Sequence, residues 1–196
     1  MSGIVGSYFN TRGSGVVAKL GTDGQVFTST GAGLSQGFEA AAGGGKIGQV
    51  VQTLKTDSTT SASTTFVTSG FAVAITPVDV SSKVLLFINC GTLTAEYSGM
   101  MMHAKIDGGN CATYIGDTVG TAYESAISTM GTYDTYGQQP NSLMYLDSPA
   151  TVSEVTYTMY WAASNGTIML NNPYNLRADG SSGNTASTFI AMEILA

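Results

Sequence analysis

The sequence predicts an all-β protein: an antiparallel β-sandwich of the jelly-roll type, preceded by an extended, glycine-rich arm. Three observations lead to this fold class. From Ile47 onward, short apolar runs alternate with polar positions at a period of two residues; Gly, Asn, Asp and Pro separate the runs; and no stretch has the 3.6-residue period of a helix. Without helices to cover a parallel sheet, we expect two packed antiparallel sheets, while the choice between a jelly roll and another sandwich stays open.

The first 46 residues are expected to form the arm. They hold 12 of the 25 glycines and few large apolar side chains, so they bury too little surface to offset the entropy cost of ordering. A run of small residues at 40–45 (AAAGGG) is typical of a hinge. We therefore divide the chain into an N-terminal attachment arm, residues 1–46, and a head domain, residues 47–196. The candidate attachment residues are its bulky apolar side chains: Ile4, Val5, Tyr8, Phe9 and Phe27.

Two strands are predicted early in the head. Phe71, Val73 and Ile75 alternate with small or polar residues, which indicates a half-buried strand, and Pro77 ends it because proline has no backbone donor for the ladder. Residues 84–88 (VLLFI) are apolar on both faces, as is typical of a central strand that is covered on two sides.

Residues 100–107 predict a further strand, which ends in a turn at 107–110 (DGGN). The alternation places His103 and Met101 on the polar face of this strand. Met101 is a soft apolar side chain in that position, which makes it a candidate for contact with a neighbouring subunit. The opposite face is expected to enter the core and consists of Met100, Met102, Ala104 and Ile106.

The end of the chain predicts a hairpin and a last strand. Residues 155–161 place four large side chains on one face, Asn165-Gly166 offers positive-φ positions, and residues 167–171 are expected to return as the partner strand. The last strand is expected at about 188–195, with alternate residues on its two faces. One face consists of Ile190, Met192 and Ile194, and the other of Phe189, Ala191 and Glu193.

Composition argues against several function classes. Thirteen acidic against seven basic residues give a net charge of −6, which does not provide the positive surface that nucleic acid needs. We see no run of 18 apolar residues and no basic-then-apolar leader, so we expect no membrane insertion and synthesis in a cytoplasm. Only 10% of residues are charged, which suggests a surface that neighbouring subunits cover.

Residues that carry chemistry are scarce. His103 is the single histidine, and Cys90 and Cys111 are the only cysteines. Acid–base and nucleophilic catalysis need a titratable group matched to a nucleophile or a second acid, so we expect no enzyme and two buried free thiols. Three Cys and His residues are too few for a structural zinc site. We expect no cofactor and no metal, although the scattered acids at 107–154 leave binding of a hard cation open.

Tyrosines alternate with small polar residues between 108 and 147. Such a mixture makes an adaptable contact surface, because the ring contributes area at low entropy cost and the hydroxyl forms hydrogen bonds. The alternative is a long loop whose tyrosines cap the core or a subunit interface. The candidate ligand or subunit contacts in this region are Tyr114, Tyr123, Tyr133 and Tyr136.

Several segments carry a resemblance to a known family. LGTDGQVFTSTGAG, at 20–33, resembles a segment of bacteriophage tail-fibre and related virion proteins that precedes a distal domain. GGGKIGQVVQTLKTDSTTSASTTFV, SSKVLLFIN, MYLDSPATVSEVTYTMYW and FIAMEIL are similar to small β-domains of phages of aquatic bacteria. Members of that family have jelly-roll heads that form homotrimers and attach through an extended N-terminal segment. Long tail fibres carry hundreds of shaft residues before the head, whereas this chain has about 46.

The resemblance implies a structural protein of a phage particle, made in the host cytoplasm and located in the virion. The short arm favours a short fibre or a head-decoration component, a homo-oligomer and most simply a trimer, mounted on capsid, portal or tail proteins. The alternative is a fibre tip that binds a receptor or a host surface glycan through residues 108–147. The mounting point, the host and the receptor stay open.

Overall fold

The structure is a computed structural model that describes residues 25–28, 37–40, 46–96, 100–130, 138–175, 180 and 182–196. The chain divides into two compact units, 1–45 and 46–196. Apart from a single 3-10 turn at Cys111–Thr113, the regular elements in the described ranges are strands, and all their pairings are antiparallel, which confirms the all-β prediction. None of the described residues forms a helix long and apolar enough to cross a membrane.

The first unit contains a short hairpin. β1 (Gln25–Thr28) pairs with β2 (Gly37–Ala40), and the register sets Phe27 opposite Phe38. This pairing is not predicted from the sequence. An isolated two-stranded hairpin is only marginally stable in water.

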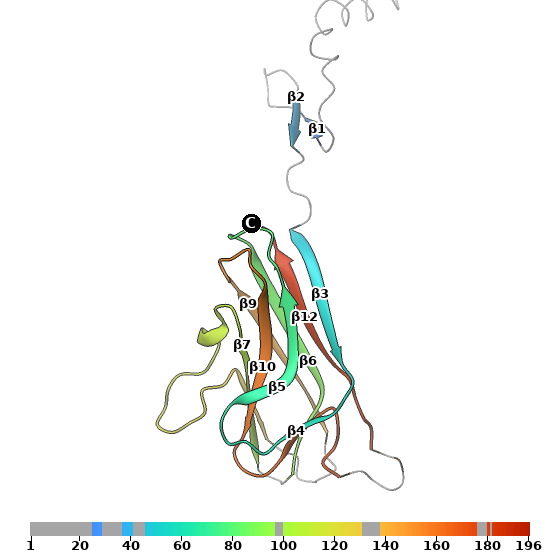
Figure 1. Ribbon diagram of the computed structural model, residues 1–196, viewed down its shortest axis with the longest axis vertical. Helices are drawn as coiled ribbons and strands as arrows, with labels where there is room; N and C mark the ends of the chain where they lie inside the picture. Colours follow the sequence, from blue (N-terminus) through green and yellow to red (C-terminus); the bar gives the residue numbers. More distant parts are fainter. Residues whose placement is uncertain are drawn as a thin grey trace, which may run out of the picture. The chain divides into compact units, whose positions relative to one another are not determined.

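The second unit is a sandwich of two sheets (Figure 1). The four-stranded sheet has the order β5 (Val67–Ile75), β10 (Val155–Ala163), β7 (Met101–Asp107) and β8 (Ile127–Met130). The six-stranded sheet contains β3 (Ile47–Lys55), β12 (Ser187–Ile194), β6 (Lys83–Ala95), β11 (Ile168–Leu170), β4 (Thr59–Ser61) and β9 (Gln139–Asp147). Because β12 and β9 pair with the same residues of β6, they lie along its two opposite edges.

The core fills the space between the two sheets. Phe71 of β5 meets Phe189 of β12 edge-to-face, with ring centroids 5.7 Å apart. The predicted alternation is confirmed in β5, β10 and β12, whose core-facing side chains are almost completely buried. The largest side chains of this core are Trp161, Tyr157, Phe71, Phe189, Ile75, Leu86 and Ile88.

Strand β6 lies at the centre of the six-stranded sheet, but only one of its faces is fully covered. Val84, Leu86 and Ile88 are completely buried, whereas Leu85 and Phe87 on the other face are half-buried. The prediction of a strand covered on both sides is therefore wrong for its outer face. The second sheet of a sandwich covers one face of the first, and no helix lies over the other in the described residues.

The predicted hairpin at the end of the chain is wrong. β10 lies between β5 and β7 and therefore has no free edge for the strand that follows it. β11 instead joins the other sheet, where it pairs with β6 and β4. Gly166 does adopt a positive φ of 62°, but the turn around it carries the chain from one sheet to the other.

Asn171 lies where β12 and β11 follow each other along the same edge of β6. The residue is buried, has a positive φ of 67°, and donates its backbone N–H to the Thr92 carbonyl. Its side-chain amide donates to the carbonyls of Lys55 and Asp57, and its Oδ1 accepts from the Ser187 hydroxyl. A single polar side chain thereby joins three strand ends in a buried position.

A buried carboxylate connects the two sheets. Asp147, at the end of β9, accepts a hydrogen bond of 2.7 Å from the Tyr157 hydroxyl on β10. It also accepts from the backbone N–H of Asn110, which anchors the predicted turn at 107–110. A Cβ on Gly109, whose φ is 53°, would lie 2.1 Å from an Asp147 oxygen, so this turn requires glycine.

Glu193 of β12 is the second buried carboxylate. It accepts hydrogen bonds from the Gln49 side chain at 2.8 Å and from the Val78 backbone N–H at 2.7 Å. Burial raises the pKa of the Glu193 carboxyl, but these hydrogen bonds outweigh that effect and the pKa lies below its ordinary value. The carboxylate thereby fastens the loop after β5 to the six-stranded sheet.

We predict that Tyr157→Phe lowers the free energy of unfolding by about 2 kcal/mol, because the buried Asp147 loses its shortest donor. Urea unfolding followed by tryptophan fluorescence measures this change. Tyr160→Phe is the control, since Tyr160 lies on the opposite, half-exposed face of the same strand. Equal effects of the two substitutions would contradict a special role for the hydroxyl of Tyr157.

We predict that Glu193 makes the fold sensitive to acid. Its pKa is lower in the folded than in the unfolded state, so its stabilisation is full above the unfolded pKa of about 4.3 and is lost as pH falls through the folded pKa. Glu193→Gln should therefore be less stable than the parent at pH 7, and the difference should shrink below about pH 4. Unfolding curves at both pH values test this, and a difference that is independent of pH would refute it.

Candidate functional site

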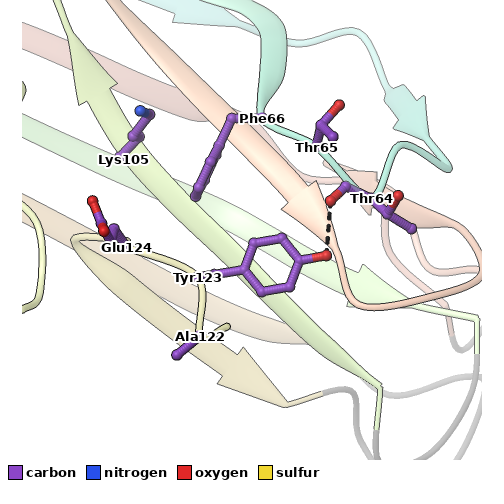
Figure 2. A pocket seen from close by; sticks show the side chains of 7 residues that line it. All are labelled: Thr64, Thr65, Phe66, Lys105, Ala122, Tyr123 and Glu124. Atoms are coloured by element: carbon purple, nitrogen blue, oxygen red, sulfur yellow. Dashed lines mark hydrogen bonds between the residues drawn. The ribbon is translucent and has the colours of Figure 1, made fainter. Parts of the chain in front are cut away.

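A shallow cleft of about 330 Å³ lies against the four-stranded sheet, on the side of this sheet that faces away from the core (Figure 2). The loop between β7 and β8 forms one wall, and the segment between β4 and β5 forms the other. Seven residues line it: Thr64, Thr65, Phe66, Lys105, Ala122, Tyr123 and Glu124.

Tyr123 holds this loop against the sheet. Its hydroxyl donates to the Thr64 carbonyl at 2.7 Å, drawn in Figure 2, and approaches the Ala163 carbonyl at 3.2 Å. Its ring stacks on the imidazole of His103 with centroids 4.1 Å apart and an interplanar angle of 15°. Because the tyrosine contributes both a ring and a hydroxyl, it joins the loop to two segments that are distant in sequence.

His103 lies beneath Tyr123 and is 8% exposed. It occupies the face opposite the core, as the alternation of the strand predicts, and the loop that carries Tyr123 packs over it. Its Nδ1 is hydrogen-bonded to the Ser128 hydroxyl at 2.7 Å, directly across the β7–β8 pair. Burial lowers the pKa of His103, so the ring is neutral at pH 7.

The lining of the cleft combines the aromatic ring of Phe66 with the positive charge of Lys105 and the negative charge of Glu124. The Lys105 ammonium lies 4.8 Å from the centroid of the Phe66 ring, within the range of a cation–π interaction. Phe66 meets Tyr123 edge-to-face at 6.1 Å. Glu124 accepts a hydrogen bond from the Thr118 hydroxyl and contributes a carboxylate to the same wall. A small polar molecule with an apolar face matches this lining.

The other predicted contact residues do not converge on the cleft. Tyr114 stacks on Tyr145 of β9 with ring centroids 4.5 Å apart, which attaches it to the six-stranded sheet instead. Met101 is half-buried at the start of β7, and its backbone N–H donates to the Ser164 hydroxyl. Tyr133 and Tyr136 lie outside the described residues.

The arm residues are described only in part. Phe27 lies in β1, opposite Phe38, while Ile4, Val5, Tyr8 and Phe9 lie outside the described residues.

Neither cysteine is suited to nucleophilic chemistry. Cys90 and Cys111 are free and fully buried, as the sequence predicts. Burial raises the pKa of the Cys90 thiol to about 12, and burial together with the negative charges of Asp147 and Asp107 does the same for Cys111. Within the described ranges, no three His, Cys, Asp or Glu side chains gather into a group that could hold a metal ion.

Sequence reasoning identified one of the seven cleft residues, Tyr123. It missed Phe66, Lys105 and Glu124, because nothing in their local sequence marks them. The fold brings them together because the loop packs against the segment that precedes β5, and the Tyr123–Thr64 hydrogen bond joins residues 59 positions apart. The sequence feature that indicates this site is a tyrosine in a long polar loop.

Comparisons with known proteins give little for this chain. No protein-family model matches it, and no curated protein does. Among solved structures it is similar to a chain of infectious bursal disease virus, Gx strain, at 12% identity and a TM-score of 0.29, over 88% of this chain and 42% of the viral one. VP2 of the same virus, in a subviral particle, gives 12% identity and a TM-score of 0.30, over 76% of this chain and 37% of that chain.

The chain therefore spans less than half the length of these viral chains. TM-scores this low do not establish a shared fold, and the fold described above rests on the strand pairing alone.

We predict that Tyr123→Phe loosens the loop over the cleft without unfolding the head. The ring still stacks on His103, but the Thr64 carbonyl loses its donor, which should cost about 1 kcal/mol. Hydrogen exchange in residues 116–126 should become several-fold faster. Tyr114→Phe in the same loop is the control, and unchanged exchange in the Tyr123 variant would show that the hydroxyl does not hold the loop.

Proposed function

We propose that this chain is a structural component of a virus particle, a short fibre or a head-decoration protein of a phage. In this proposal it assembles as a homotrimer, is made in the host cytoplasm, and is mounted on a capsid, portal or tail protein through residues 1–46. The observation that carries the proposal is the string LGTDGQVFTSTGAG at 20–33, which resembles phage virion proteins and leads into a β-sandwich of the expected class.

The physical properties of the two segments support this division of labour. The head has a continuous core and buried carboxylates that are hydrogen-bonded, so it is built to be rigid. The arm is rich in glycine, and its described part is one short hairpin. An arm of this kind gains order by pairing with a partner chain, which satisfies its backbone donors and acceptors.

A second candidate function is a tip that binds a receptor or a host surface glycan. The cleft favours it, because a sugar ring presents an apolar face that can stack on Phe66 and hydroxyls that can bond to Lys105 and Glu124. Of the Tyr-rich region, Tyr123 is the member that lines this cleft. The two functions are compatible, since attachment through the arm leaves the head free to bind.

We predict that deletion of residues 1–46 leaves a folded head with nearly the same melting temperature and abolishes incorporation into particles. Tyr8→Ala with Phe9→Ala in the full chain should weaken incorporation in the same way, because these are the first bulky aromatic side chains amid glycines. Co-sedimentation with particles measures this.

The matched control is Val78→Ala with Val80→Ala, two exposed apolar side chains in a loop of the head. Attachment lies in the head if the truncated protein and the Tyr8/Phe9 variant sediment with particles as fully as the parent. The second candidate function requires the truncated head to bind host cells and to lose that binding when Lys105 is replaced by Ala.

A further inference from the structure

The outer face of the six-stranded sheet carries an apolar surface that no described element covers. β3, β12, β6 and β9 are neighbours in this sheet (Figure 1), and their pairing aligns the outward side chains in rows across it. The first row is Val50, Met192, Leu85 and Leu146, and the second is Gln52, Ile190, Phe87 and Met144. A third row, Leu54, Thr188, Asn89 and Ser142, changes to polar residues. We call these three rows the outer face.

The outer face is most exposed along its two edges. On β3, Val50 is 57% and Leu54 59% exposed, and on β9, Met144 is 62% and Leu146 46% exposed. The side chains between them, on β12 and β6, are half-buried except for Asn89, which is exposed. Four strands by three rows span about 19 by 20 Å, or about 400 Å², and the two mainly apolar rows make up about 250 Å² of this area.

Charge identifies the class of partner. The outer face contains twelve positions in three rows and no Asp, Glu, Lys or Arg at any of them. A charged surface would lose its hydration there without gaining an ion pair, whereas a second copy of the same face offers apolar groups to apolar groups.

The width of the face is compatible with an assembly of three copies. Three flat faces about 19 Å wide, closed into a triangular prism, place each sheet about 5.5 Å from the axis. That distance is close to half of the roughly 10 Å at which sheets pack face to face, so side chains fill the centre without a hole. Four copies would leave an open channel along the axis.

We propose that the outer face is the surface through which three copies of this chain associate about a three-fold axis. This inference rests on the self-association in the proposed function but not on the identity of the particle. In such an assembly the β3 edge of one copy lies beside the β9 edge of the next. Among the described residues each of these strands has one pairing partner, β12 for β3 and β6 for β9, so both edges are open to a neighbour.

The test is the mass of the full-length protein by light scattering across a dilution series. The parent should have three times the 20.2 kDa mass of one chain. Val50→Glu should raise the concentration at which the assembly dissociates at least about ten-fold, because it buries an unpaired charge at the interface. The double variant Met144→Lys with Leu146→Lys tests the opposite edge of the face. It replaces Val50→Glu as the test if that variant does not fold. Val152→Glu is the matched control, since Val152 is 56% exposed and lies outside the outer face.

The outcomes separate this inference from the proposed function. A trimeric parent with dissociated face variants and a trimeric control supports it. Folded face variants that stay trimeric overturn it and leave the proposed function intact. A parent that is monomeric at micromolar concentration overturns the self-association as well, and a dimeric parent overturns the three-fold geometry.

Cross-linking then tests which edges meet. Within one copy, Gln52 and Met144 lie on opposite edges of the face, three strand spacings or about 14 Å apart. Gln52→Cys with Met144→Cys should give covalent trimers with a short bis-maleimide, and either single substitution should give none. The native thiols of Cys90 and Cys111 should not react with the maleimide, because both are fully buried. Equal cross-linking of the double and single variants would contradict the proposed edge contact.

Discussion

The hydrogen bond between the Tyr157 hydroxyl and the Asp147 carboxylate fixes how the two sheets of the head face each other. Hydrophobic burial holds the sheets together but is not directional, so it leaves their relative position loosely defined. A hydrogen bond to a buried carboxylate is directional, and leaving the carboxylate without donors costs several kcal/mol. The same carboxylate holds the Asn110 backbone and requires glycine at position 109. The loop that carries Tyr123 starts from that turn, so the cleft depends on this bond as well.

Local patterns predicted the strands, but not their partners. The period of two assigned Phe189, Ala191 and Glu193 to one face and Ile190 and Met192 to the other, and the structure has the same division. The hairpin prediction failed because pairing depends on which edges are already occupied, and β10 has none left. That information is distributed over the whole chain and is not present in the turn.

The sites were harder to predict than the fold, for a related reason. The sequence of a strand that is apolar on both sides, such as β6, does not show which face meets the second sheet. The outer face therefore could not be located from the sequence. The burial of His103 was equally hidden, since the ring that covers it lies in a loop without regular structure. The seven-residue cleft shows the same limit, because loops and strands that are far apart in sequence form it.

The position of β12 has a consequence for the order of events during folding. This strand lies between β3 and β6, and its Glu193 bonds to Gln49 across 144 residues of chain. Contacts of such long range form late, because a large loop must close before they are gained. Until β12 pairs with β3, β3 has no described neighbour in the sheet. The outer face then lacks the side chains that β12 contributes to its three rows. A nascent or truncated chain that lacks β12 therefore has an incomplete outer face, so the proposed three-fold association would require a head that has finished folding.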